Sequence, residues 1–111
     1  MSILSSKIQG VSVILPDGRL DTNNYLDAEK LVAAHVEAGD TKIIFDFSKT
    51  DYVSSAGLRV ILKAAKLVRA DGKIALCNSN EQIHEVLEIS GFLDMLDHYG
   101  SLEEAMQSVA D

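Results

Sequence analysis

The sequence contains few cysteine, proline or aromatic residues. Its 111 residues include one Cys, one Pro and no Trp, with three Tyr and three Phe. A single Cys excludes an intramolecular disulfide and a zinc site built from several cysteines. No apolar run approaches the ~18 residues of a membrane-spanning helix, and the first ten residues lack the charged-then-apolar order of a secretion signal. We therefore expect a soluble cytoplasmic protein that holds no metal or cofactor and does not insert into membranes.

Basic residues are also scarce. Ten Lys and Arg stand against 17 Asp and Glu, which gives a formal net charge of −7. A surface of this sign argues against direct nucleic-acid binding, which depends on basic contacts to phosphates. Hydrophobic residues make up 47% of the chain and charged residues 24%, a balance that permits a packed core and excludes disorder of the whole chain. The length is that of one domain, which we place at residues 1–111.

Short apolar runs alternate with helical patterns along the chain. The runs predict strands, and the 3.6-residue patterns between them predict helices that begin at capping residues: Asn24, then Asn80 or Ser79, and Ser101. This alternation indicates an α/β domain with a mostly parallel sheet of four to five strands, an antiparallel edge strand and about four helices. Pro16-Asp17-Gly18 is predicted as a turn. The expected strands are 3–8, 11–15, 42–47, 73–77 and a piece within 92–99; the expected helices are 24–38, 54–70, 80–89 and 101–110.

Side chains that could support catalysis or metal binding are dispersed. His35, His84 and His98 fall in three separate elements, and none has the H-x-x-x-H or H-E-x-x-H spacing of metal ligands. Cys77 closes an apolar strand, which predicts a buried structural thiol. Asp17 and Asp46 lie at turns or strand ends, where turn and capping roles are expected. We do not expect an enzyme.

The segment 53–57, Val-Ser-Ser-Ala-Gly, resembles half of a nucleophile elbow but lacks the leading Gly that lets a strand turn sharply around the serine. A small hydrolase that uses Ser55 therefore stays as the least favoured alternative.

Ser54 and Ser55 join a central strand to the second expected helix. Either serine alone could be an ordinary N-cap, because the first N–H groups of a helix lack partners. The pair also lies at the carboxyl end of an inner strand, where α/β sheets place ligands and partners. A phosphate added there would meet the positive end of the helix dipole and leave the fold intact.

Positive charge is concentrated in the second expected helix. Residues 54–73 hold five basic residues and one acidic residue, whereas the rest of the chain holds five basic and sixteen acidic ones. Arg59, Lys63 and Lys66 follow i, i+4, i+7 and form one basic stripe, and nearly all other residues of this helix are apolar. The apolar band is wider than one sheet face needs. Either the helix is wedged between the sheet and a neighbouring helix, or this face binds a partner.

Three blocks of sequence resemble one known family. They are Val53-Ser54-Ser55-Ala56-Gly57-Leu58-Arg59 after Asp51, Gly18-Arg19-Leu20-Asp21 before the first helix, and Val86-Leu87-Glu88-Ile89-Ser90-Gly91-Phe92-Leu93 at the end of the third. Together they resemble the STAS-domain anti-sigma-factor antagonists, in order and spacing, over nearly the whole chain.

The resemblance implies a partner switch. In that family the unphosphorylated protein binds an anti-sigma factor that is also an ATP-dependent serine kinase, so that the kinase releases its target. Phosphorylation abolishes the complex, and a serine phosphatase restores binding. Alignment on Gly57 gives Ser55 as the acceptor and Ser54 as second choice; Ser54 stands where many members have Asp. The expected partner-binding residues are Asp21, Asn23, Ser54, Ala56, Gly57, Arg59, Lys63 and Lys66. The alternative is a STAS-like scaffold or transporter-associated domain without serine phosphorylation.

Overall fold

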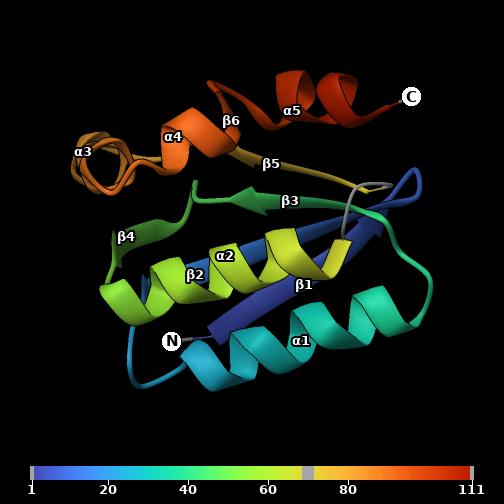
Figure 1. Cartoon of the computed structure of the whole chain (residues 1–111), viewed down its shortest axis with the longest axis horizontal. Helices are drawn as coiled ribbons and strands as arrows, with labels where there is room; N and C mark the ends of the chain where they lie inside the picture. The colour runs from blue at the N-terminus through green and yellow to red at the C-terminus, as the bar shows by residue number, and fades with distance from the viewer. Residues whose placement is uncertain (1, 69–71, 111) are drawn as a thin grey trace.

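The computed structural model describes residues 2–68 and 72–110 as six strands and five helices around one mixed sheet (Figure 1). The main sheet has the order β1-β2-β3-β5-β6, and β4 pairs with β2 off this path. β1 (Ser2–Ile8) and β2 (Val11–Leu20) are antiparallel, and the pairs β2–β3, β2–β4, β3–β5 and β5–β6 are parallel. The predicted α/β class and antiparallel edge strand are confirmed. The remaining strands are β3 (Lys42–Asp46), β4 (Thr50–Val53), β5 (Lys73–Cys77) and β6 (Asp97–Tyr99).

The β1–β2 hairpin turns at Gln9 and Gly10, which both have positive φ, at 51° and 82°. Two consecutive positive φ angles suit the two-residue turns that match the twist of paired strands. The predicted turn at Pro16-Asp17-Gly18 is wrong, because β2 continues to Leu20. Gly18, at φ 93°, marks a register shift where β2 leaves β1 and pairs with β4. The three residues therefore form an irregularity within a strand, and Asp17 is an exposed strand residue opposite Ser2.

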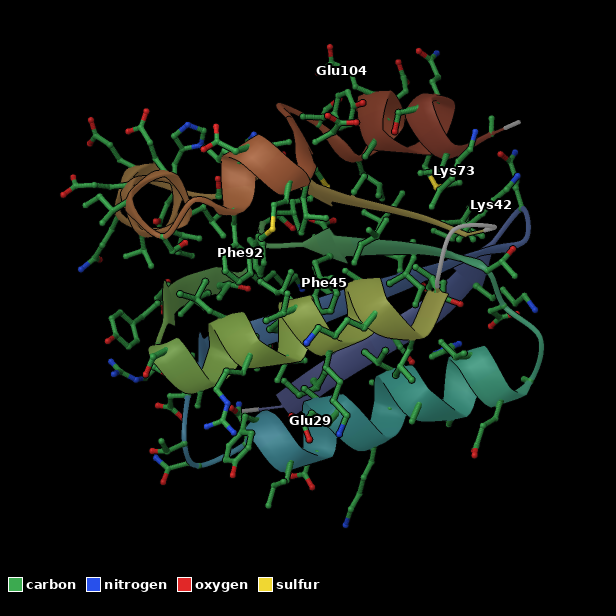
Figure 2. The ribbon with its side chains drawn as sticks, in the orientation of Figure 1. Glu29, Lys42, Phe45, Lys73, Phe92 and Glu104 are labelled. Atoms are coloured by element: carbon green, nitrogen blue, oxygen red, sulfur yellow. The ribbon has the colours of Figure 1, made fainter. Side chains whose placement is uncertain are left out.

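Helices cover both faces of the sheet (Figure 1). α1 (Tyr25–Glu37) and α2 (Ser55–Val68) pack side by side on one face, and α5 (Leu102–Val109) covers the other. α3 (Glu81–Ile89) and the short α4 (Phe92–Met95) follow β5. Figure 2 shows Phe45 pointing from β3 toward α2, and this ring is fully buried and stacks on Phe47 at 6.3 Å between centroids. α2 is thus wedged between the sheet and α1, which accounts for its wide apolar band.

Two of the three predicted caps are confirmed. The Asn80 Oδ1 accepts a hydrogen bond from the Ile83 N–H at 2.8 Å, and the Ser101 Oγ accepts one from the Glu104 N–H at 3.1 Å. Asn24 also precedes its helix, but its side chain makes no cap bond. The Asn24 amide is used instead to close the loop before α1. The predicted end of the second helix falls at residues 69–71, which lie outside the described residues.

A polar cluster ties the hairpin to the end of α1. The Ser12 hydroxyl donates to Asp40 Oδ2 at 2.8 Å, His35 Nδ1 lies 3.0 Å from the same oxygen, and Lys7 pairs with Oδ1. The hydrogen bond from Lys7, followed by that from Ser12, lowers the pKa of Asp40 to about 2. Asp40 is buried whereas Lys7 is half-exposed, so water screens part of this stabilisation.

We expect Asp40→Asn to remove an acid-dependent part of the stability. Because the pKa of Asp40 is lower in the folded chain than the ordinary 3.8, its contribution is present above about pH 4 and is lost as the pH falls toward 2. Through Asp40, the free energy of unfolding of the wild type should fall by about 1 kcal/mol between pH 7 and pH 3, after allowance for screening. Urea unfolding at pH 7 and pH 3 measures it. Asp17→Asn, at an exposed strand position, is the control. If Asp40→Asn and the wild type lose the same free energy of unfolding between pH 7 and pH 3, Asp40 is not the source of the acid-dependent stability.

Candidate functional site

The two serines at the start of α2 have different surroundings. The Ser54 N–H donates to Leu20 O, the Ser54 carbonyl accepts from the Leu58 N–H, both at 2.9 Å, and the Ser54 Oγ accepts from the Gly57 N–H at 3.4 Å. Ser54 is therefore the N-cap of α2. Ser55 is the first helical residue and is exposed, and within the described part of the chain its hydroxyl has no hydrogen-bond partner. Sequence alone left either serine as the cap; the structure assigns that role to Ser54.

Gly57 and Ala56 are buried beneath this surface, although both were predicted to contact a partner. A Cβ on Gly57 would lie 2.7 Å from the Leu20 carbonyl oxygen and 2.8 Å from Val53 Cγ1. Glycine is required there because the first turn of α2 lies directly against β2 and β4. In the free chain both residues offer almost no surface of their own, and the close contact of Gly57 with β2 and β4 sets the position of the first turn of α2.

The loop between β2 and α1 forms the second wall of the site. Asp21 is also buried, and its carboxylate accepts hydrogen bonds from the Asn23 N–H and from Arg19 Nε, each at 3.0 Å. The bond from the Asn23 backbone, followed by that from Arg19, lowers the pKa of Asp21. The Asn24 side chain completes the loop by accepting from the Asp21 N–H and donating to Arg19 O. Asp21 therefore shapes the loop, whereas Asn23 is exposed on it.

Arg19 is a residue of this wall to which the sequence alone gave no role. Its guanidinium lies 4.4 Å from the centre of the Tyr52 ring and also pairs with Asp21. Stacking on an aromatic face and pairing with a carboxylate both restrict the side chain. The sequence placed Arg19 in the Gly18-Arg19-Leu20-Asp21 block, but it gave no indication that Arg19 contacts Tyr52.

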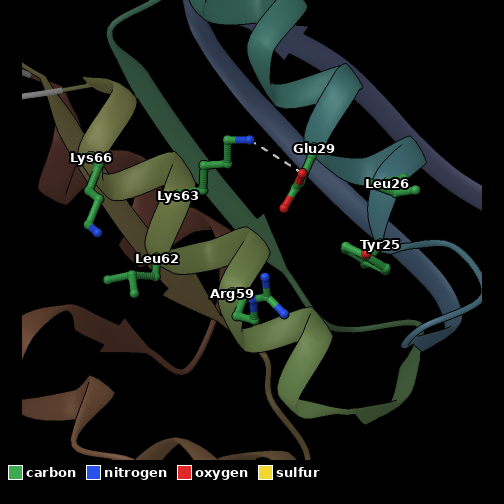
Figure 3. Close-up of a pocket in the computed structure, with 7 residues that line it drawn as sticks. All are labelled: Tyr25, Leu26, Glu29, Arg59, Leu62, Lys63 and Lys66. Carbon is green, nitrogen blue, oxygen red and sulfur yellow. Dashed lines mark hydrogen bonds and ion pairs between the residues drawn. The ribbon is translucent and has the colours of Figure 1, made fainter.

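A groove between α1 and α2 extends from this site (Figure 3). Its volume is about 560 Å³. Figure 3 shows the predicted basic stripe along one wall, with Lys63 Nζ 3.4 Å from Glu29 Oε1 on the other. Ser55 precedes Arg59 by four residues, so it lies one turn from the stripe on the outward side of the helix. The α1 wall was not predicted from the sequence. The groove is lined by Tyr25, Leu26, Glu29, Arg59, Leu62, Lys63 and Lys66.

Two of the three histidines meet although they are distant in sequence. The rings of His84 and His98 lie 5.0 Å apart between centroids, and Ser79 Oγ is 2.7 Å from His98 Nε2. Burial, and secondly the proximity of His84, lowers the pKa of His98. His35 lies elsewhere, in the Asp40 cluster. In residues 2–68 and 72–110 no group of three His, Cys, Asp or Glu side chains could hold a metal ion.

The remaining candidates have structural roles. Cys77 is fully buried, and burial raises its pKa to about 12, so the predicted structural thiol is confirmed. The Asp46 carboxylate accepts from the Ser48 N–H and from the Asn78 side chain, each at 3.0 Å, which confirms its turn-forming role. In the described part of the chain no histidine is hydrogen-bonded to Ser55.

Comparisons with known proteins show similarity in sequence and in fold over nearly the whole chain. BtrV of Bordetella bronchiseptica, a candidate anti-sigma factor antagonist, is 37% identical over 95% of this chain and 91% of its own. The crystal structure of TM1081 from Thermotoga maritima, also a candidate anti-sigma factor antagonist, matches 98% of this chain and 95% of its own with a TM-score of 0.92 at 24% identity. The phosphorylated form of SpoIIAA, a cell fate determinant of Bacillus, matches 97% and 99% with a TM-score of 0.76 at 22% identity.

The described residues contain no helix that is both long enough and apolar enough to cross a membrane. The model of the STAS domain matches residues 2–105, which include β1, the loop before α1 and the serine pair. The match therefore covers every element of the site, and this chain belongs to the STAS domain family.

Proposed function

We propose that this chain is an anti-sigma factor antagonist whose binding is ended by phosphorylation of Ser55. The antagonist role is supported by its relative BtrV at 37% identity. In this scheme the anti-sigma factor is also an ATP-dependent serine kinase, the unphosphorylated chain binds it and releases its target, and a serine phosphatase restores the unphosphorylated chain. Because the kinase requires ATP, the exchange takes place in the cytoplasm.

The difference between Ser54 and Ser55 is the observation that carries the proposal. Ser54 caps α2 with both its carbonyl and its hydroxyl, whereas the Ser55 hydroxyl is exposed. Phosphorylation of Ser54 would disturb the cap. Phosphorylation of Ser55 would add a dianion at the positive end of α2, where an anion is favoured and the fold is retained.

The groove offers a reason for the loss of binding. A phosphate brings about −1.5 to −2 charges at pH 7, and Arg59 lies one turn away on the same helix. The new charge offsets the positive stripe of Arg59, Lys63 and Lys66 and repels an acidic partner surface. Burying the phosphate in an interface would also remove its hydration at a cost of several kcal/mol. No rearrangement of the sheet is needed.

The proposed contact surface has two parts. Asn23 on the loop before α1 and Ser55 are exposed at the end of the sheet, and the basic stripe continues from them along α2. Asp21, held by Arg19 and the Asn23 backbone, keeps this loop in place. Gly57 and Ala56 act from beneath by fixing where α2 begins.

We expect the protein purified from its native host to carry one phosphate on Ser55 in part of the molecules. Intact-mass measurement and peptide mapping test this for the wild type, Ser55→Ala and Ser54→Ala. The phosphate should be absent from Ser55→Ala and present in Ser54→Ala. The reverse pattern would show that Ser54 is the acceptor. A wild type that carries no phosphate, and takes none from ATP in a host extract, would favour the scaffold alternative.

A further inference from the structure

The outward face of α3 carries negative charge that the proposed function does not use. Glu81, Glu85 and Glu88 are exposed at i, i+4, i+7. The Ile89 side chain is 77% exposed on the same face, one turn beyond Glu85. Single exposed apolar side chains are common on proteins, so the informative feature is the combination. An exposed apolar side chain lies at the end of a row of regularly spaced carboxylates.

The α2 wall of the groove carries the opposite charge at the same spacing, and the α1 wall adds one carboxylate, Glu29, which pairs with Lys63. Arg59, Lys63 and Lys66 also follow i, i+4, i+7, so each set of three spans about 10 Å of helix. Leu26 on the rim of the groove is 55% exposed, and Leu62 lines its wall. Figure 1 shows α3 away from this groove within one molecule, so a chain cannot place its own α3 there.

We propose that α3 of one copy of this chain docks in the α1–α2 groove of a second copy. Glu81, Glu85 and Glu88 of one copy face the basic stripe of the other, and Ile89 covers the exposed Leu26. An amphipathic helix laid in a groove between two helices is a common mode of recognition. This inference rests on the groove and the outward face of α3, and it does not require phosphorylation of Ser55.

Self-association through this contact should be weak and sensitive to salt, because exposed ion pairs each contribute little. The docked copy would occupy the surface that we propose for the anti-sigma factor. Self-association and partner binding would therefore compete. A phosphate on Ser55 would weaken both by offsetting the charge of the groove.

Sedimentation velocity over a range of protein concentrations tests the contact. At about 10 mM salt, where the Debye length is about 30 Å, the weight-average mass of the wild type should rise with concentration. At about 1 M salt, where it is about 3 Å, the mass should return to that of one chain. Circular dichroism and thermal unfolding check that each variant is folded. A wild type that keeps the mass of one chain at low salt would overturn the proposal.

Two charge reversals separate a specific contact from an effect of net charge. Glu81, Glu85 and Glu88 are changed to Lys in one variant, and Arg59, Lys63 and Lys66 to Glu in the other. Each alone should stay at the mass of one chain at low salt. An equimolar mixture should associate again, because each reversed surface then meets its complement. A mixture that stays at the mass of one chain would overturn the proposal.

A third reversal controls for net charge. In this variant Asp17, Glu37 and Glu103, which are exposed on β2, α1 and α5, are changed to Lys. The net charge then changes from −7 to −1, as it does in the α3 reversal. This control should associate as the wild type does; its failure to do so would assign the effect to net charge and overturn the contact. Ile89→Ser, with no charge change, should lower the association constant several-fold. An unchanged constant would count against α3 as the docked element.

Discussion

Ser55→Asp is expected to weaken binding to the anti-sigma factor about tenfold, whereas Ser55→Ala should bind as tightly as the unphosphorylated wild type. A tenfold loss corresponds to about 1.4 kcal/mol. Aspartate carries one charge where a phosphate carries nearly two, so the phosphorylated protein should lose more, about a hundredfold or beyond. Alanine removes a hydroxyl that is not used in the fold, because Ser54 supplies the cap. Calorimetric titration with the anti-sigma factor, first recovered from the native host on Ser55→Ala as bait, measures these differences.

Two further variants locate the effect. Ser6→Asp adds the same charge at an exposed position on β1 and should leave the affinity unchanged. Ser54→Ala should lose about 1 kcal/mol of folding stability with its cap and still bind. Equal affinities of Ser55→Asp and Ser55→Ala would show that charge at this position does not control the interface.

The second large effect is on stability, and it concerns Gly57. Alanine is the better helix former by about 1 kcal/mol, so propensity alone predicts that Gly57→Ala stabilises α2. The structure predicts the opposite sign, because the added Cβ would meet the Leu20 carbonyl oxygen at 2.7 Å and Val53 Cγ1 at 2.8 Å. Backbone cannot yield as a flexible side chain does, and overpacking of this kind costs about 3 kcal/mol.

Urea unfolding of Gly57→Ala and wild type measures this difference. Gly100→Ala is the matched control: its Cβ would meet only Glu104 Oε1, at 3.4 Å, and the expected change is about 0.5 kcal/mol or less. A Gly57→Ala protein as stable as the wild type would mean that α2 can move away from β2 at little cost. The close contact of Gly57 with β2 and β4 would then not be what fixes the position of Ser55.

The sequence pattern predicted the main strands and helices because each buries a continuous apolar run or stripe. β4 escaped detection because it has four residues and includes the polar pair Asp51-Tyr52. Its pairing depends on β2 continuing through Pro16-Asp17-Gly18, a composition that ordinarily indicates a turn. The residue types of this segment alone favour a turn. The tertiary partner, with Thr50 Oγ1 donating to Pro16 O at 2.6 Å, keeps the chain extended.

The site was predictable in part for a similar reason. The serine pair and the basic stripe are local patterns, and helical spacing was sufficient to place Arg59, Lys63 and Lys66 on one surface. The separate roles of Ser54 and Ser55 depend on where α2 begins, and the hydrogen bond from the Ser54 N–H to Leu20 O, which is distant in sequence, helps to set that point. The α1 wall of the groove, and the burial of Gly57, arise only when two elements pack together, and a single sequence does not specify that packing.

The position of β4 has a consequence for local opening of the fold. Among the described residues β4 pairs with β2 alone, over three register positions, and on its other side the Asn80 side chain donates to the Thr50 and Asp51 carbonyls at 3.5 and 3.2 Å. Few backbone hydrogen bonds need to break for this strand to detach, whereas β3 is held between two parallel neighbours. The free energy of local opening is lower for a strand that has fewer hydrogen bonds to its neighbours. Amides of β4 should therefore exchange with solvent deuterium well before those of β3, so the strand that leads into the serine pair can open while the centre of the sheet stays closed.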